Sequence, residues 1–139
     1  MSKVVSMRLK TQLWDRLEAM ARRLGRTPSE ASALLLDEAL RSAEFGLIQF
    51  RDSPVGRQAY VIGTSLAVWE VVFLARRFEG DPKALATHLG WPSAKVKAAL
   101  IYAEAYPEEI EMAIADNDRG SEPLRRALPG LETVTIGKP

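Results

Sequence analysis

The chain has 139 residues, enough for one ordinary domain or two small ones, and a hydrophobic content of 47% predicts a globular fold. The net charge of +1 excludes nucleic-acid binding through overall basic charge and leaves only a local basic face. Because there is no cysteine, disulfides, thiol chemistry and cysteine zinc sites are excluded. The first residues lack the apolar region of a signal peptide, and the longest apolar stretch, residues 67–75, is too short to span a bilayer. We therefore expect a cytoplasmic protein with no membrane partner.

Residues 3–9 alternate in polarity, which predicts a short β-strand. One face of this strand comprises Val5, Met7 and Leu9. The opposite face comprises Val4, Ser6 and Arg8. A strand needs a backbone partner, and the twin strand of a second copy is the obvious candidate.

Two helices are predicted next. The first covers residues 11–24, where leucines and a methionine recur at spacings of three and four. Thr11 is expected to act as its N-cap, and Gly25 to end it. The second helix has a complete start signal, with Thr27 as N-cap, Pro28 at the first helical position and Glu30 three residues after the cap. It is expected to end near the glycine at position 46.

The pattern then changes to shorter elements. Residues 47–50 and 59–62 are β-rich and, with turn signals between them, are compatible with a hairpin. Four further helices are expected over residues 68–78, 82–89, 93–106 and 108–115, where Asp81 and Ser93 cap the second and third.

Residues 117–139 contain several glycines and prolines and are expected to form a flexible tail. Within it, residues 131–136 would become a strand only on a suitable surface. The predicted fold is therefore mainly α, with one module over residues 1–45, a second of short strands and a helical bundle over 46–116, and the tail.

A lone strand followed by two capped helices of these lengths resembles the ribbon-helix-helix family of the Arc and MetJ repressors, over residues 3–45. In that family two chains pair their strands into an antiparallel ribbon that enters the DNA major groove. The resemblance implies a homodimer, with the apolar face of the strand in its core. Each signal is common when taken singly, and the prediction rests on their order and spacing.

The resemblance also implies which residues meet operator DNA. The base-reading positions would be Val4, Ser6 and Arg8, of which Arg8 can form two hydrogen bonds with a guanine, while Val4 departs from the more polar residue usual there. The phosphate-contacting residues would be Lys3, Lys10, Arg26, Thr27 and Ser29, because the family holds a phosphate at the start of its second helix.

The stretch from Ile62 to Val72, which reads IGTSLAVWEVV, resembles the opening of a small bacterial antitoxin-associated domain with a homeodomain-like helical bundle. The resemblance covers about residues 47–115, and it departs at Ser65, where an arginine is typical. Such domains are encoded beside PIN-like ribonuclease toxins. Together with the first module, the resemblance implies an antitoxin of the VapB type.

Independently of family, residues 82–100 have the pattern of a helix-turn-helix, with Ala86 at the helix contact, Gly90 in the turn and Val96 in the core of the second helix. Lys95 and Lys97 would lie on or near its exposed face. Two interpretations remain, a second DNA contact and a plain bundle for dimerisation or partner binding. The second is favoured, because the helix is rich in alanine and has only two basic residues.

No enzyme, cofactor or metal site is expected. His88 is the single histidine and has no companions at ligand spacing. The acidic run over residues 104–111 is interpreted as a solvated helix start rather than a catalytic carboxylate pair.

The preferred hypothesis is an antitoxin that represses its own operon as a dimer and masks a cognate ribonuclease toxin, in a complex that can be of higher order. Arg119, Arg125 and Arg126 are candidates to enter the carboxylate-lined site of the toxin, although they are equally compatible with a solubilising role. The alternatives are a stand-alone regulator with a C-terminal oligomerisation or sensor module, and an interaction scaffold that does not bind DNA.

Overall fold

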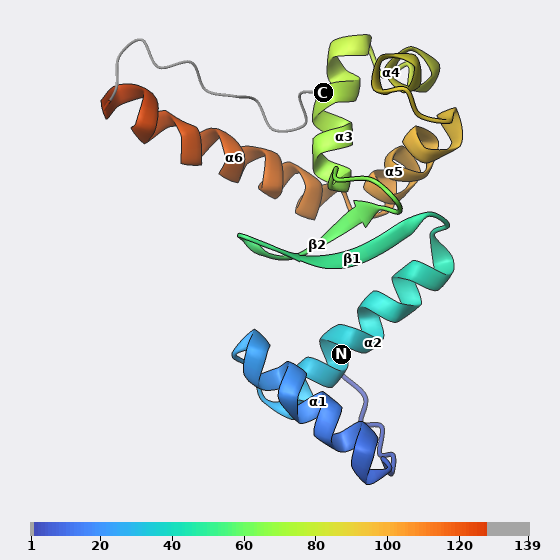
Figure 1. Cartoon of the computed structure of the whole chain (residues 1–139), viewed down its shortest axis with the longest axis vertical. Coiled ribbons are helices and arrows are strands. Elements are labelled where there is room, and N and C mark those ends of the chain that lie inside the picture. The colour runs from blue at the N-terminus through green and yellow to red at the C-terminus, as the bar shows by residue number, and fades with distance from the viewer. Residues whose placement is uncertain (1, 128–139) are drawn as a thin grey trace. The chain divides into compact units, whose positions relative to one another are not determined.

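The structure is a computed structural model that describes residues 2–127, with only the helical backbone described for residues 119–127. The chain divides into two units, residues 1–41 and 42–139. Figure 1 shows the elements of each unit in chain order. The structure is mainly helical, with one two-stranded antiparallel sheet.

The first unit contains helix α1 (Thr11–Leu24) and most of helix α2 (Pro28–Glu44), as the periodicity predicts. Gly25 ends α1 in the left-handed region, with φ of 66°, where a residue without a Cβ is unstrained. The predicted cap at the start of α1 is wrong: Lys10 is the N-cap, without a side-chain hydrogen bond, and Thr11 is already helical.

Residues 2–10 have no regular secondary structure, so the strand predicted over residues 3–9 is not formed in the single chain. A strand is defined by backbone hydrogen bonds to a neighbour, and the predicted neighbour is a second copy. The ribbon of the ribbon-helix-helix arrangement therefore stays a prediction.

The second unit begins with a hairpin of β1 (Ile48–Ser53) and β2 (Gly56–Val61), in a register that pairs Ile48 with Val61 and Ser53 with Gly56. The hairpin is confirmed, but its strands extend further towards the turn than the sequence predicts. The added residues are polar and form the tip, where the Asp52 carboxylate and the Arg57 guanidinium lie 3.2 Å apart. Strand pairing at an exposed tip needs no apolar alternation, so the sequence pattern could not mark it.

Five helical elements follow the hairpin. They are α3 (Val68–Ala75), the 3-10 turn η1 (Arg76–Phe78), α4 (Pro82–Leu89), α5 (Ser93–Ala105) and α6 (Pro107–Ala127). The Asp81 side chain caps α4 as predicted and accepts a hydrogen bond from the backbone N–H of Lys83 at 3.0 Å. The N-cap of α5 is Pro92, so the prediction that Ser93 is the cap is wrong.

Helix α6 corrects the predicted start of the tail. It runs to Ala127 instead of ending near residue 115, so residues 117–127 are helical rather than a flexible tail. Among its residues with described side chains, the last buried one is Ile114, so contact with the core ends about where the apolar stripe ends. Residues 128–139, including the possible strand at 131–136, lie outside the described residues.

The core of the second unit lies between the hairpin and the helices. Its largest fully buried side chains are Val61, Val68, Val71, Leu85, Val96 and Tyr102. The Tyr102 ring meets Phe45 and Phe50 edge-on, with ring centroids 5.4 and 6.3 Å apart. In the part of the chain that the structure describes, no helix combines the length and apolarity needed to cross a bilayer.

Candidate nucleic-acid interface

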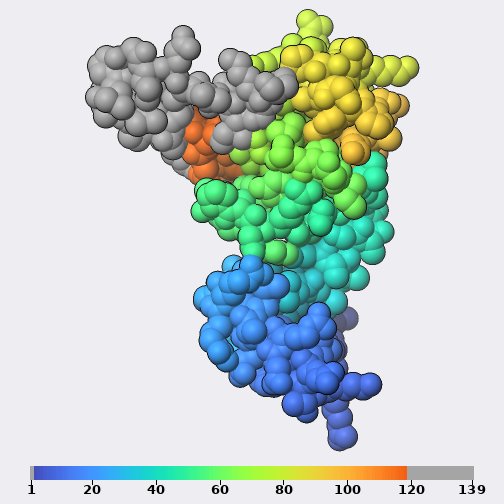
Figure 2. Space-filling view, in the orientation of Figure 1, coloured from blue at the N-terminus to red at the C-terminus, as the bar shows by residue number. Residues whose placement is uncertain are grey.

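The N-terminal segment exposes both of its faces. Val5 and Met7, from the face predicted to pack in a dimer, are 78% and 66% exposed, and Leu9 is half-buried. Val4, from the predicted base-reading face, is 94% exposed, and Ser6 and Arg8 are exposed as well. The space-filling view shows the first residues, in dark blue, at the surface of their unit (Figure 2). The apolar face is therefore uncovered in the single chain.

The two helices of the first unit also leave large apolar side chains uncovered. Its described buried residues are Ala21, Ala31 and Glu38, two of which are small. The exposed large ones are Leu13, Trp14, Leu36 and Leu40, each between 43% and 55% exposed. Each such side chain gains roughly 1.5–3 kcal/mol when it is fully buried. Residues 2–41 thus have enough large apolar side chains for a hydrophobic core, but these side chains are not buried in the single chain.

Charge is segregated along the chain. Residues 1–41 contain eight lysines and arginines and five acidic residues, a net charge of +3. Residues 42–118 contain seven basic and eleven acidic residues, a net charge of −4. The overall charge of +1 therefore conceals a basic N-terminal unit, which would double its charge in a dimer.

The start of α2 is predicted to hold a phosphate. Two of its backbone amides already donate hydrogen bonds to side chains of the same helix start. The backbone N–H of Thr27 donates to Glu30 Oε1 at 3.0 Å, and the N–H of Glu30 donates to Thr27 Oγ1 at 3.2 Å. Hydrogen bonding to the Glu30 carboxylate, first from the backbone N–H of Thr27 and then from its side chain, lowers the pKa of Glu30, so the carboxylate is charged at neutral pH. Arg26 and Ser29 are exposed beside this capping box. A phosphate arriving here would meet a carboxylate that already holds one of the amides.

The predicted helix-turn-helix pattern is present in the second unit. Gly90 ends α4 with φ of 70°, and the N–H of Trp91 donates to the carbonyl of Ala86 at 2.9 Å, which tightens the turn before α5. Ala86 and Val96 are buried where the pattern places them. These residues account for the packing of the two helices.

The outer face of α5 is not basic. Its exposed positions at helical spacing are Ala94, Lys97, Ile101 and Glu104. Lys95 is half-buried, with its Nζ beside the turn at Gly63. A single fully exposed lysine on this face, within residues 42–118 of net charge −4, is a poor match for DNA phosphates. The surface favours the interpretation as a partner-binding bundle.

The turn over residues 61–66 contains the Gly-Thr pair of the second resemblance, and Arg51 contacts it from the hairpin. The guanidinium of Arg51 donates to the carbonyl of Thr64 at 2.6 Å and lies over the Tyr60 ring, 4.8 Å from its centroid. The Thr64 hydroxyl donates to the carbonyl of Val61 at 2.9 Å. Sequence reasoning missed Arg51, whose only signal was a long cation in a β-rich segment.

The three arginines proposed for toxin binding, Arg119, Arg125 and Arg126, lie on the helical backbone of α6, beyond the described side chains. Comparison with family models, with curated proteins and with solved structures found no match to this chain.

Proposed function

We propose that the chain is a dimeric DNA-binding antitoxin, whose first 45 residues read an operator and whose remaining residues bind a ribonuclease toxin. The observation that carries the DNA-binding half is the uncovered apolar face of Val5 and Met7, in a unit with a net charge of +3. A second copy would cover this face through an antiparallel ribbon, which leaves Ser6 and Arg8 on the side that meets the base edges.

The acidic character of residues 42–118 supports the toxin-binding half. A ribonuclease must attract a polyanion, so its substrate surface is basic. These residues, with a net charge of −4, complement such a surface and are repelled by DNA. The same charge argues against a second DNA contact through α5.

Co-expression with the protein encoded next to this chain tests the toxin-binding half. We expect the two proteins to elute together at a mass that contains two copies of this chain, with the ribonuclease activity silenced. Elution of this chain alone, with its own promoter DNA still bound, would replace the antitoxin by the stand-alone regulator.

Binding to its own promoter DNA tests the other half. Arg8→Ala is expected to weaken binding by about tenfold and to relax the preference for the base that it reads, because a bidentate guanine contact contributes roughly 1–3 kcal/mol. Arg22→Ala is the matched control, since Arg22 is an exposed arginine of the same unit that lies 3.4 Å from Glu18 and outside the predicted ribbon. Equal effects of the two substitutions would contradict a base-reading role of Arg8. No binding by the unchanged chain would favour the scaffold that does not bind DNA.

A further inference from the structure

The two units of the chain differ in how much apolar surface each buries. The hydrophobic core of the second unit consists of 17 buried side chains between Ile48 and Ile114. In the first unit, the buried hydrophobic side chains among the described residues are those of Ala21 and Ala31, and neither is larger than a methyl group. Burial of apolar surface is the dominant favourable contribution to folding. The second unit therefore has a core of its own, and the first unit, as a single chain, does not.

The first unit is also short. Residues 1–41 are close to the length of about 40 residues below which small domains usually need disulfides, metals or oligomerisation. The chain has no cysteine, so no disulfide can stabilise the unit. Helix α1 has 14 residues, and isolated helices shorter than about 12–15 residues are only marginally stable in water. The helices of this unit therefore need to pack against apolar surface that the single unit does not supply.

A second copy of the chain can supply that surface. The uncovered side chains of the first unit include Val5 and Met7 before α1, and Leu36 and Leu40 in α2. Leu36 and Leu40 are four residues apart and so lie on the same face of α2. In a symmetric dimer the same surface of both copies forms the interface, so each of these side chains is covered in both copies.

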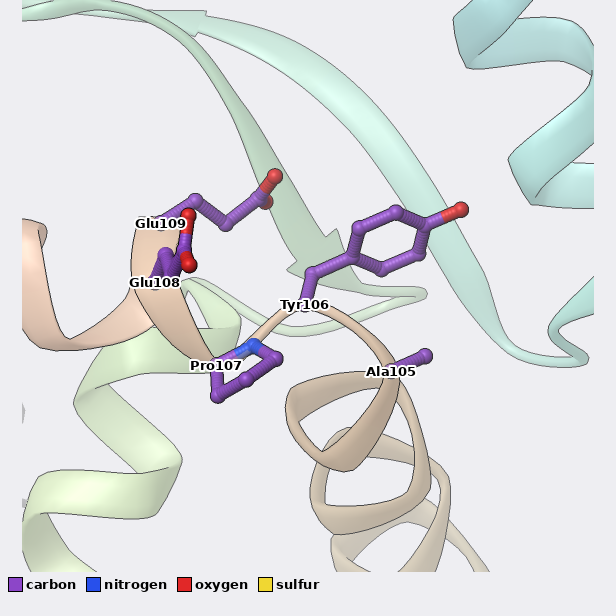
Figure 3. A pocket seen from close by; sticks show the side chains of 5 residues that line it. All are labelled: Ala105, Tyr106, Pro107, Glu108 and Glu109. Atoms are coloured by element: carbon purple, nitrogen blue, oxygen red, sulfur yellow. The ribbon is translucent and has the colours of Figure 1, made fainter.

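The boundary between the two units lies inside a helix. Helix α2 continues to Glu44, whereas the first unit ends at Arg41. Directly after the helix, the Phe45 ring packs edge-on against Tyr102 and Tyr106, with ring centroids 5.4 and 5.8 Å apart. Figure 3 shows the Tyr106 ring projecting from the junction of α5 and α6, beside a pocket. The last turn of α2 is therefore anchored to the core of the second unit through Phe45.

We propose that residues 2–41 fold only when two copies associate, whereas residues 42–118 fold as a single chain. The helices described for the first unit are then those of the associated form, and in the monomer α2 is shortened to its last turn. Dilution removes the DNA-binding unit and leaves the partner-binding unit folded. This coupling rests on the proposed dimer, but it is measured without DNA or toxin, so its failure is distinguishable from failure of the proposed function.

The test is amide hydrogen exchange of the full chain over a range of protein concentrations. While the dimer still predominates, about a hundredfold dilution should speed exchange in α1 and in α2 up to residue 41 by about tenfold, because the unfolded fraction rises with the inverse square root of concentration. The amides of α3 and α5 should exchange at the same rate at every concentration. Exchange in α1 and α2 that does not depend on concentration would overturn the proposal, and so would an equal dependence in α3 and α5.

Leu36→Ala and Ile101→Ala are matched variants, because the two side chains are 55% and 56% exposed. Alanine favours a helix at both positions, so neither change weakens its own helix. Leu36→Ala removes apolar surface that the second copy would cover, and at a fixed concentration it should speed exchange in residues 12–41 by at least about tenfold. Ile101→Ala, in α5, should leave exchange in these residues unchanged. Equal effects of the two substitutions would refute the burial of α2 by a second copy.

Operator binding separates this coupling from the proposed function. A chain that shows the dilution effect but does not bind its own promoter DNA would retain the coupling and lose the proposed function. A chain whose first unit is equally protected at every concentration would lose the coupling, and its DNA binding would still be decided by the Arg8 variant.

Discussion

The buried hydroxyl of Tyr102 donates a hydrogen bond of 2.8 Å to the carboxylate of Glu109, so the core of the second unit is joined directly to the first turn of α6. Removal of this donor by Tyr102→Phe should lower the free energy of unfolding by about 1 kcal/mol, the usual contribution of a partly buried hydrogen bond. Chemical denaturation measures the change. Tyr60→Phe is the control, because the Tyr60 ring contact with Arg51 does not involve a hydroxyl. Equal effects of the two substitutions would contradict a specific contribution from the Tyr102 hydrogen bond.

Arg51 should be more important for stability than its place on a short hairpin suggests. Arg51→Lys keeps the charge but loses the planar group that reaches the carbonyl of Thr64 and stacks on Tyr60. We expect a loss of about 1–2 kcal/mol, measured by thermal or chemical unfolding. The substitution Arg57→Lys, at the hairpin tip, should cost less. Equally small losses of stability in the two variants would contradict a stabilising role of Arg51 at the turn.

Glu70 predicts a pH dependence of stability. Its side chain is buried, and burial raises its pKa above 4.5, although the N–H of Ala67 donates to it at 3.1 Å. Between pH 4.5 and the higher pKa of the folded state, the folded chain binds this proton more tightly than the unfolded chain. The stabilisation is therefore complete below pH 4.5 and is lost as pH rises through the folded pKa.

Glu70→Gln should remove this dependence, because an amide oxygen still accepts from Ala67 and carries no charge. The variant is expected to be more stable than the natural chain at pH 7, and its advantage should shrink below pH 4.5. Unfolding curves at several pH values measure the difference. An advantage that grows towards acid pH would contradict a raised pKa.

Met7→Asp tests the proposed ribbon. A charge on the face that also contains Val5 would be buried without a partner in the dimer, so dimerisation should be lost. Mass determination in solution over a range of concentrations measures the effect. Val55→Asp, at the 80% exposed tip of the hairpin, is the control and should leave the mass unchanged. A dimer that persists in the Met7 variant would place the interface elsewhere.

Glu30 should oppose DNA binding if a phosphate docks at the start of α2. Glu30→Gln keeps a side chain that can reach the N–H of Thr27 but removes the negative charge. Operator affinity is then expected to rise by about twofold to fivefold at low salt, since a phosphate at the positive end of the helix would no longer face a like charge. Fluorescence anisotropy with labelled promoter DNA measures the change. Unchanged affinity would exclude this helix start from the DNA contact.

The sequence by itself determined the local features of this protein. The left-handed Gly25, the capping box of Thr27 and Glu30, the cap at Asp81 and the turn at Gly90 all lie where the sequence predicts them. Each depends on atoms only a few residues apart, so the identity of the residue is nearly sufficient. The segregation of charge is equally a property of the sequence.

The tertiary structure decided the features that join distant residues. Leu47, and not the neighbouring Gly46, adopts the left-handed conformation, where its carbonyl accepts a 2.8 Å hydrogen bond from the N–H of Ile62. The hydrogen bond from Arg51 to the carbonyl of Thr64 likewise forms only when the hairpin is in place. The ring contact between Phe45 and Tyr106 forms only when α5 is in place. No local pattern encodes these contacts, because their free energy depends on which surfaces the folded chain brings together.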